Sequence, residues 1–172
     1  MGLTNTITIL AAILSIITGT AGGLYFSFRL KMREDTLRDL VRTFREMSLL
    51  IRHRALPIGE LFRELSSNEF ISRVLELREM HELSGEGSCF RESWNKTADE
   101  LNELSESERS TIKSIGRSLG ASDIEGQLSM LEVNAALLEN FAEEAHEQYI
   151  QKGKLYRSMG TLAGLFAAVM II

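Results

Sequence analysis

The stretch Thr6–Phe28, TITILAAILSIITGTAGGLYFSF, contains no charged side chain and sets the first limit on the fold. As an α-helix it would measure roughly 35 Å at ~1.5 Å per residue, and the hydrocarbon core of a bilayer is about 30 Å thick. We therefore predict an N-terminal transmembrane helix within residues 1–28. A signal peptide would need a basic leading segment, and Met1–Asn5 has no Lys or Arg. The start Met1–Thr6 matches the myristoylation pattern, but a lipid would be redundant beside a span.

A second uncharged segment, Ser158–Ile172 (SMGTLAGLFAAVMII), is short for a membrane span. It would need help from Leu155 and Tyr156 or local thinning of the bilayer. A buried core helix is the alternative interpretation. Because no polar residue follows Thr161, we predict a C-terminal transmembrane helix at residues 158–172.

All charged side chains lie between the two segments, in residues 29–157. Basic residues accumulate on the cytoplasmic side of membrane proteins. They flank both segments here on the inner side only, at Arg29, Lys31, Arg33, Lys152, Lys154 and Arg157. We therefore predict that residues 29–157 form a cytoplasmic domain and that both termini lie outside. The residues expected at the lipid interface are Arg29, Lys31, Arg33, Lys154, Tyr156 and Arg157.

Each predicted membrane helix carries small residues at helical spacing. These stripes are Ser15, Gly19 and Gly23 in the first segment and Gly160, Gly164 and Ala168 in the second. Small residues four apart allow two helix backbones to approach closely in lipid. The sequence leaves open whether the stripes pack on each other or on a partner's helix.

The chain between the segments is predicted to be helical throughout. Proline occurs once, at Pro57, and no stretch alternates apolar and polar residues for long enough to indicate a strand. The single cysteine, Cys89, excludes an internal disulfide and a cysteine-based zinc site. We predict an all-α fold: an antiparallel helical bundle flanked by an N-terminal and a C-terminal transmembrane helix.

Turn and cap residues divide the bundle. Pro57 disfavours helix in the residue before it and suits the first turn of the next helix. Ser105 and Glu108 form a capping box, and Gly120 lies where a glycine stops a helix. The predicted helices cover residues 29–54, 58–65, 69–83, 88–100, 105–119 and 124 onward, the last continuing into the second membrane segment with Gly153 as a weak point.

The first and last of these helices should lie side by side and antiparallel, because each adjoins a membrane segment. The first has one apolar face, made of Leu30, Leu37, Leu40, Val41, Phe44, Met47 and Ile51. The last has a coiled-coil type of seam, made of Ile124, Leu128, Leu131, Ala135, Leu138, Ala142, Ala145 and Tyr149. Phe90, Trp94 and Leu101 are the expected core side of the 88–100 helix.

Charge separates along the chain. Residues 29–54 carry eight basic and four acidic side chains, and residues 121–151 carry seven acidic and no basic ones. We expect mutual attraction of the two helices, and an acidic face open to a basic partner is the alternative. The formal net charge of −5 makes nucleic acid a poor partner, since phosphates require a basic surface.

Candidate catalytic chemistry is sparse. Glu143 and His146 have the spacing of a carboxylate-bridged di-iron helix, but such a site needs a second copy of the motif and further inward glutamates. No phosphate-binding loop or nucleophile elbow is present. We predict a protein that is not an enzyme and has no cofactor, with a membrane-bound metalloenzyme using Glu143 and His146 as the alternative.

Several stretches resemble the stage III sporulation protein AB family. They are Arg29–Arg33 (RLKMR), Leu56–Phe62 (LPIGELF), Ser118–Gln127 (SLGASDIEGQ) and Lys154–Leu165 (KLYRSMGTLAGL). The resemblance extends over the whole chain. It implies a component of the mother-cell membrane in endospore-forming bacteria, within a secretion-like complex that links mother cell and forespore.

The resemblance also implies a partner. The family's cytoplasmic domain is similar to the platform protein of type II secretion and type IV pilus systems, which meets a cytoplasmic ATPase. The corresponding partner would be the stage III sporulation protein AA ATPase, together with other membrane components of the channel complex and membrane lipid. This chain has one helical domain where the platform proteins have two. A simple membrane tether without ATPase contact is therefore a further alternative.

The expected contact surface is the junction before the last helix, far along the bundle from the membrane. Its candidate residues are Gly120, Asp123, Glu125 and Gln127. For Asp123, or for Ser122, capping of the following helix is the competing role.

Overall fold

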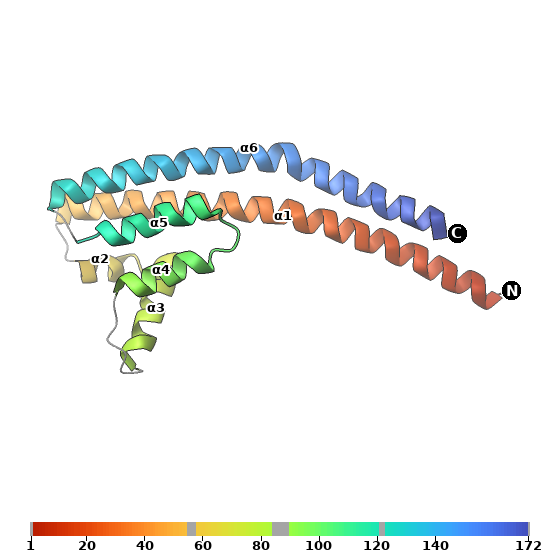
Figure 1. Cartoon of the computed structure of the whole chain (residues 1–172), viewed down its shortest axis with the longest axis horizontal. Helices are drawn as coiled ribbons and strands as arrows, with labels where there is room; N and C mark the ends of the chain where they lie inside the picture. Colours follow the sequence, from red (N-terminus) through yellow and green to blue (C-terminus); the bar gives the residue numbers. More distant parts are fainter. Residues whose placement is uncertain (1, 55–57, 84–89, 121–122, 172) are drawn as a thin grey trace. The chain divides into compact units, whose positions relative to one another are not determined.

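The computed structural model describes residues 2–54, 58–83, 90–120 and 123–171 (Figure 1). These residues form helices and no strand, which confirms the predicted all-α class. The helices are α1 (Gly2–Arg54), α2 (Ile58–Glu64), α3 (Glu69–Leu83), α4 (Phe90–Glu100), α5 (Glu106–Ser118) and α6 (Ile124–Ile171). Pro57, the Gly85–Gly87 loop, the cap Ser88 and Cys89 lie outside the described residues.

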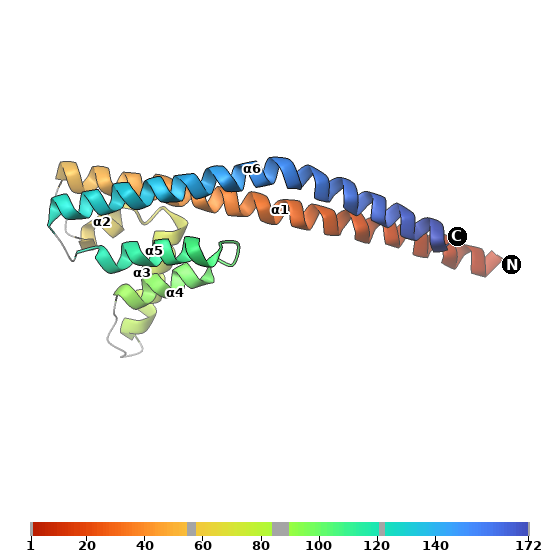
Figure 2. The same cartoon turned by 45° about the horizontal axis from the view of Figure 1, so that its top comes forward.

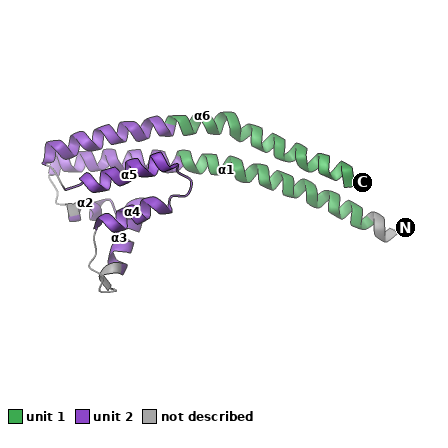
Figure 3. Cartoon of the chain, in the orientation of Figure 1, with its two compact units in different colours: residues 1–34, 143–172 green, residues 35–142 purple. Residues whose placement is uncertain are grey.

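The chain divides into two compact units, coloured separately in Figure 3. Unit 1 comprises Met1–Glu34 and Glu143–Ile172, and unit 2 comprises Asp35–Ala142. Packing therefore groups residues 29–34 and 143–157 with the two apolar segments. The division predicted from charge, at residues 28 and 157, concerns which residues lie in the membrane and stays a prediction.

Unit 2 is built on an antiparallel pair formed by the end of α1 and the start of α6, which lie side by side in Figures 1 and 2. Arg52 donates to Glu132 across this pair at 2.5 Å, and Arg45 pairs with Glu139. The predicted attraction between a basic and an acidic helix is thus present. Both ion pairs are about half exposed, so each is worth only about 0–1 kcal/mol.

Both helices of this pair also bury apolar side chains. The buried side chains from α1 are Leu37, Leu40, Val41, Phe44, Met47 and Ile51, and those from α6 are Leu131, Ala135, Leu138 and Ala142. The predicted seam was wrong at Ile124, which is 48% exposed. Since Arg52 lies opposite Glu132, Ile124 would face positions beyond Arg54, where α1 has already ended.

The other helices of unit 2 enclose an aromatic cluster around Trp94. Helix α4 packs against both α3 and α5. The fully buried Trp94 ring contacts four phenylalanines at centroid distances of 4.9 to 6.1 Å, namely Phe44, Phe62, Phe70 and Phe90. Its Nε1 donates to the Ile112 carbonyl of α5 at 2.8 Å. This hydrogen bond satisfies the polar atom of the largest core side chain.

Helix α4 differs in detail from the prediction. Its buried face consists of Ser93, Trp94, Thr97 and Ala98. Phe90 and Leu101 are only half buried, because Phe90 begins the helix and Leu101 follows its end.

Local capping agrees with the sequence. Ser105 and Glu108 form both hydrogen bonds of the predicted capping box. Gly120 has φ 75°, a left-handed conformation that favours glycine, and it follows the C-cap Leu119. Asn68 Oδ1 accepts from the Ile71 amide at 3.2 Å and thereby caps α3.

Candidate functional site

In unit 1, α1 and α6 are in backbone contact along their apolar segments. A Cβ atom added to Gly19 would lie 2.6 Å from the Gly160 carbonyl oxygen, and one added to Gly160 would lie 2.5 Å from the Gly19 carbonyl oxygen. A Cβ at Gly23 would meet the Tyr156 carbonyl oxygen at 2.5 Å. The two small-residue stripes therefore pack on each other, which is one of the two arrangements that the sequence left open.

These contacts fix the register of the pair. A Cβ on Gly153 would lie 3.1 Å from Ser27 Oγ, and one on Gly164 would lie 3.0 Å from Ile16 Cα. Residues 158–171 therefore run alongside the apolar stretch of α1. Helix α6 passes through Gly153 without a break, and this glycine lies beside Ser27 of α1.

The outer surface of the two apolar segments in unit 1 is formed by apolar side chains. Side chains more than half exposed include Ile9, Leu10, Leu14, Ile17 and Phe28 of α1 and Leu162, Phe166, Val169 and Met170 of α6. Within the part of the chain that the structure describes, α1 is long and apolar enough to cross a membrane, with mean hydropathy 2.0 over its most apolar window. Only 11% of that window is buried, unlike the core helix of a soluble protein.

A polar cluster links the two helices beyond the apolar segments. The Glu34 side chain is 3% exposed, and its carboxylate is 2.8 Å from His146 Nδ1 and 3.2 Å from Lys31 Nζ. Lys31 Nζ also lies 5.5 Å from the centroid of the Tyr149 ring, and Arg33 donates to Gln148 at 3.0 Å. The Glu34 carboxylate therefore has polar partners on both helices.

The alternative metal site predicted from the sequence would use Glu143 and His146, which have different surroundings in the structure. His146 is paired with Glu34 of the other helix, while Glu143 is exposed. Among the described residues, no three His, Cys, Asp or Glu side chains lie together in a way that could hold a metal. Sequence reasoning missed the pair of Glu34 and His146 because it searched for ligands along one helix.

The basic residues expected at the interface occupy different environments. Lys31 and Arg33 contact Tyr149 and Gln148 across the helix pair, whereas Arg29 and Lys154 are exposed. Arg157 is exposed too, and its Nε donates to the Gly153 carbonyl at 3.2 Å. The half-exposed Tyr156 ring lies 5.7 Å from that of Phe26.

The four candidate contact residues lie in unit 2 around the start of α6. Asp123 caps this helix, because its Oδ1 accepts from the Gly126 amide at 3.0 Å. Glu125 is exposed in the first turn, and Gln127 is half buried with a backbone hydrogen bond to the Asp123 carbonyl at 3.0 Å. Gly120 has the left-handed conformation that follows the end of α5. Asp123 and Glu125 are both charged and exposed, and the Asp123 carboxylate is already used in the cap.

The cap at Asp123 can be tested separately from any partner contact. Asp123→Ala is expected to lower the free energy of unfolding by about 1 kcal/mol, because the Gly126 amide loses its acceptor. Asp123→Asn keeps an oxygen acceptor and should unfold like the wild type. Chemical denaturation followed by Trp94 fluorescence measures both, and equal loss in the two variants would show that the carboxylate has another role.

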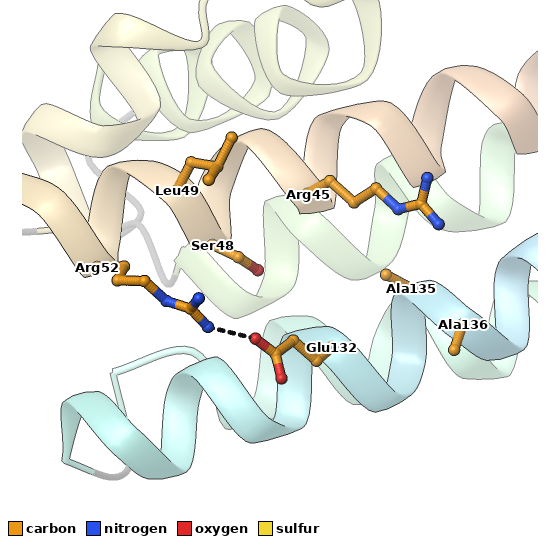
Figure 4. Close-up of a pocket in the computed structure, with 7 residues that line it drawn as sticks. All are labelled: Arg45, Ser48, Leu49, Arg52, Glu132, Ala135 and Ala136. Atoms are coloured by element: carbon orange, nitrogen blue, oxygen red, sulfur yellow. Dashed lines mark hydrogen bonds and ion pairs between the residues drawn. The ribbon is translucent and has the colours of Figure 1, made fainter.

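A shallow hollow of about 340 Å3 lies between α1 and α6 in unit 2 (Figure 4). It is lined by Arg45, Ser48, Leu49, Arg52, Glu132, Ala135 and Ala136. Its charged side chains already pair across the hollow. Elsewhere in unit 2, hydrogen bonds to Glu76 and Glu100 raise the pKa of Arg73, a side chain that is charged at neutral pH in any case.

These features define a class: an all-α protein with a long helix that could cross a membrane and a second helical segment packed closely against it. The chain belongs to the stage III sporulation protein AB family, whose model matches residues 8–172. This match confirms the resemblance inferred from the sequence and is consistent with a role in sporulation. Searches of curated proteins and of solved structures gave no match.

Proposed function

We propose that this chain is a non-enzymatic membrane platform that docks a cytoplasmic ATPase within the secretion-like complex linking mother cell and forespore during endospore formation. The observation that carries the proposal is the glycine-packed helix pair of unit 1, whose outward side chains are apolar along residues 6–28 and 158–171. Such a surface suits lipid and provides a fixed anchor for a helical domain. Membership of a sporulation family supports the biological setting.

The register of unit 1 supports a hairpin that crosses the membrane twice. Residues 158–171 touch the backbone of α1 within its apolar stretch, so a bilayer around α1 would also surround them. The basic residues on the inner flank of each segment orient residues 29–157 toward the cytoplasm and both termini to the outer side. The membrane in question would be that of the mother cell.

The start of α6 is the proposed docking surface. The Asp123 cap lies at the start of this helix, and the Glu125 carboxylate is exposed in its first turn. The proposed partner is the stage III sporulation protein AA ATPase, and other membrane components of the channel complex would contact unit 1. A basic patch on the ATPase would complement the exposed Glu125 carboxylate.

Binding of the full chain to the purified ATPase tests this proposal. The chain is reconstituted in lipid nanodiscs, and we expect saturable binding at physiological salt. Glu125→Lys should weaken binding about tenfold, as expected for loss of one charge-assisted contact. Glu92→Lys is the matched control, because Glu92 is also exposed and lies in the first turn of a helix of unit 2.

Two results would contradict the proposal in different ways. If wild-type chain with native helicity fails to bind the ATPase, the platform function is wrong and the simple tether replaces it. If both lysine variants bind like the wild type, docking uses another surface than the start of α6.

A further inference from the structure

Arg157 lies deeper along the helix pair than the other basic residues of unit 1. A Cβ atom added to Gly23 would be 3.3 Å from Arg157 Cα, so Arg157 lies level with Gly23. Gly23 precedes Arg29 by six residues, which is about 9 Å along an α-helix. The backbone of Arg157 is therefore inside the apolar stretch of α1, although its side chain is exposed.

The Arg157 side chain turns back toward the start of α6. Its Nε donates to the carbonyl of Gly153, one turn earlier, and Gly153 lies beside Ser27. Under the proposed topology this direction leads from the apolar layer to the cytoplasmic headgroups, as long basic side chains do at membrane interfaces. The hydrogen bond uses Nε, and the rest of this exposed guanidinium can donate to another acceptor.

Lys154 shares this face of α6. It precedes Arg157 by three residues, a spacing that places two side chains next to each other on a helix. Lys154 is also exposed. The sequence has no acidic residue in 148–172 or in 1–33. No nearby carboxylate on either helix of the pair therefore competes for the two cations.

We propose that Lys154 and Arg157 together bind the phosphate group of an anionic phospholipid in the cytoplasmic leaflet. Arginine can bind two phosphate oxygens at once, and lysine adds a point charge. Under the proposed topology, the Arg157 guanidinium would lie at the level of the lipid headgroups, next to apolar side chains that face the acyl chains. This position favours the phosphate of a lipid over a phosphate in solution. This inference rests on the membrane hairpin of the proposed function.

The test measures lipid binding to the full chain by native mass spectrometry from micelles, with phosphatidylglycerol and phosphatidylcholine in competition. We expect the wild type to retain phosphatidylglycerol preferentially. The double variant Lys154→Gln with Arg157→Gln should lose about fivefold in this preference per base removed. The matched control, Arg91→Gln with Lys96→Gln, removes the same charges from exposed positions of α4 and should behave as wild type.

Further measurements separate the possible failures. Equal retention of both lipids by the wild type, or equal loss in the control, would overturn the site. Displacement of phosphatidylglycerol by inorganic phosphate would also overturn it, since the ligand would then be a free anion. Flotation with vesicles after a urea wash tests the hairpin independently, and failure to float would reject the hairpin together with the site.

Discussion

Gly116→Ala is expected to destabilise unit 2 by about 3 kcal/mol, the upper part of the range for overpacking a core. Gly116 is buried in α5, and a Cβ atom there would lie 2.3 Å from Trp94 Cδ1 and 2.5 Å from its Nε1. The indole ring cannot move aside, because four phenylalanine rings surround it and its Nε1 is hydrogen-bonded to Ile112. The clash outweighs the gain of about 1 kcal/mol that alanine brings to a helix interior.

The chain offers a matched control in Gly59 of α2, where an added Cβ would have no neighbour within 4 Å. Gly59→Ala should be neutral or stabilising by less than about 1 kcal/mol. Trp94 is the single tryptophan, so its emission during denaturation reports on unit 2 alone. Equal stability of the two alanine variants would mean that the ring and α5 are less closely packed than the structure shows.

Gly160→Leu is expected to separate the two helices of unit 1. Its Cβ alone would lie 2.5 Å from the Gly19 carbonyl oxygen and 2.8 Å from Gly23 Cα. These are backbone atoms, so no side-chain rotation relieves the clash. The helix axes would have to move to about 8–10 Å apart, the spacing of helices that meet through larger side chains.

Spin labels measure this separation directly. Cysteines introduced at the exposed positions Thr18 and Ala163, with Cys89 replaced by serine, place one label on each helix. We expect a short, narrow distance distribution for the parent and a longer, broader one for Gly160→Leu. Gly22→Leu is the control, because a Cβ there meets nothing within 4 Å. An unchanged distribution in Gly160→Leu would contradict the backbone contact.

Much of the fold was predictable because it depends on local patterns. The apolar periodicity around Phe44 located the buried face of α1, and the capping box at Ser105 located the start of α5. The end of the seam at Ile124 was not predictable, since it depends on where α1 stops opposite it. Gly116 was missed for a similar reason: a glycine within a helix is by itself only a weak helix former, and its role requires the position of Trp94.

The candidate site was predictable in its residue types but not in its pairings. Glycines at steps of four indicated close helix contact, yet only the register showed that Gly19 meets Gly160. Glu34 and His146 are separated by most of the chain, so no spacing rule connects them. The docking role of Glu125 is still a prediction, because exposure alone does not identify a partner.

The contact of Gly19 with Gly160 involves no ionisable group and depends on the close packing of two backbones. Ionic strength will therefore act unequally on the different contacts between α1 and α6. Salt screens the exposed pairs Arg45–Glu139 and Arg52–Glu132 in unit 2. It has no comparable effect on two glycine backbones. The same two helices are thus joined by exposed ion pairs, which weaken as salt is added, and by a glycine backbone contact, which does not.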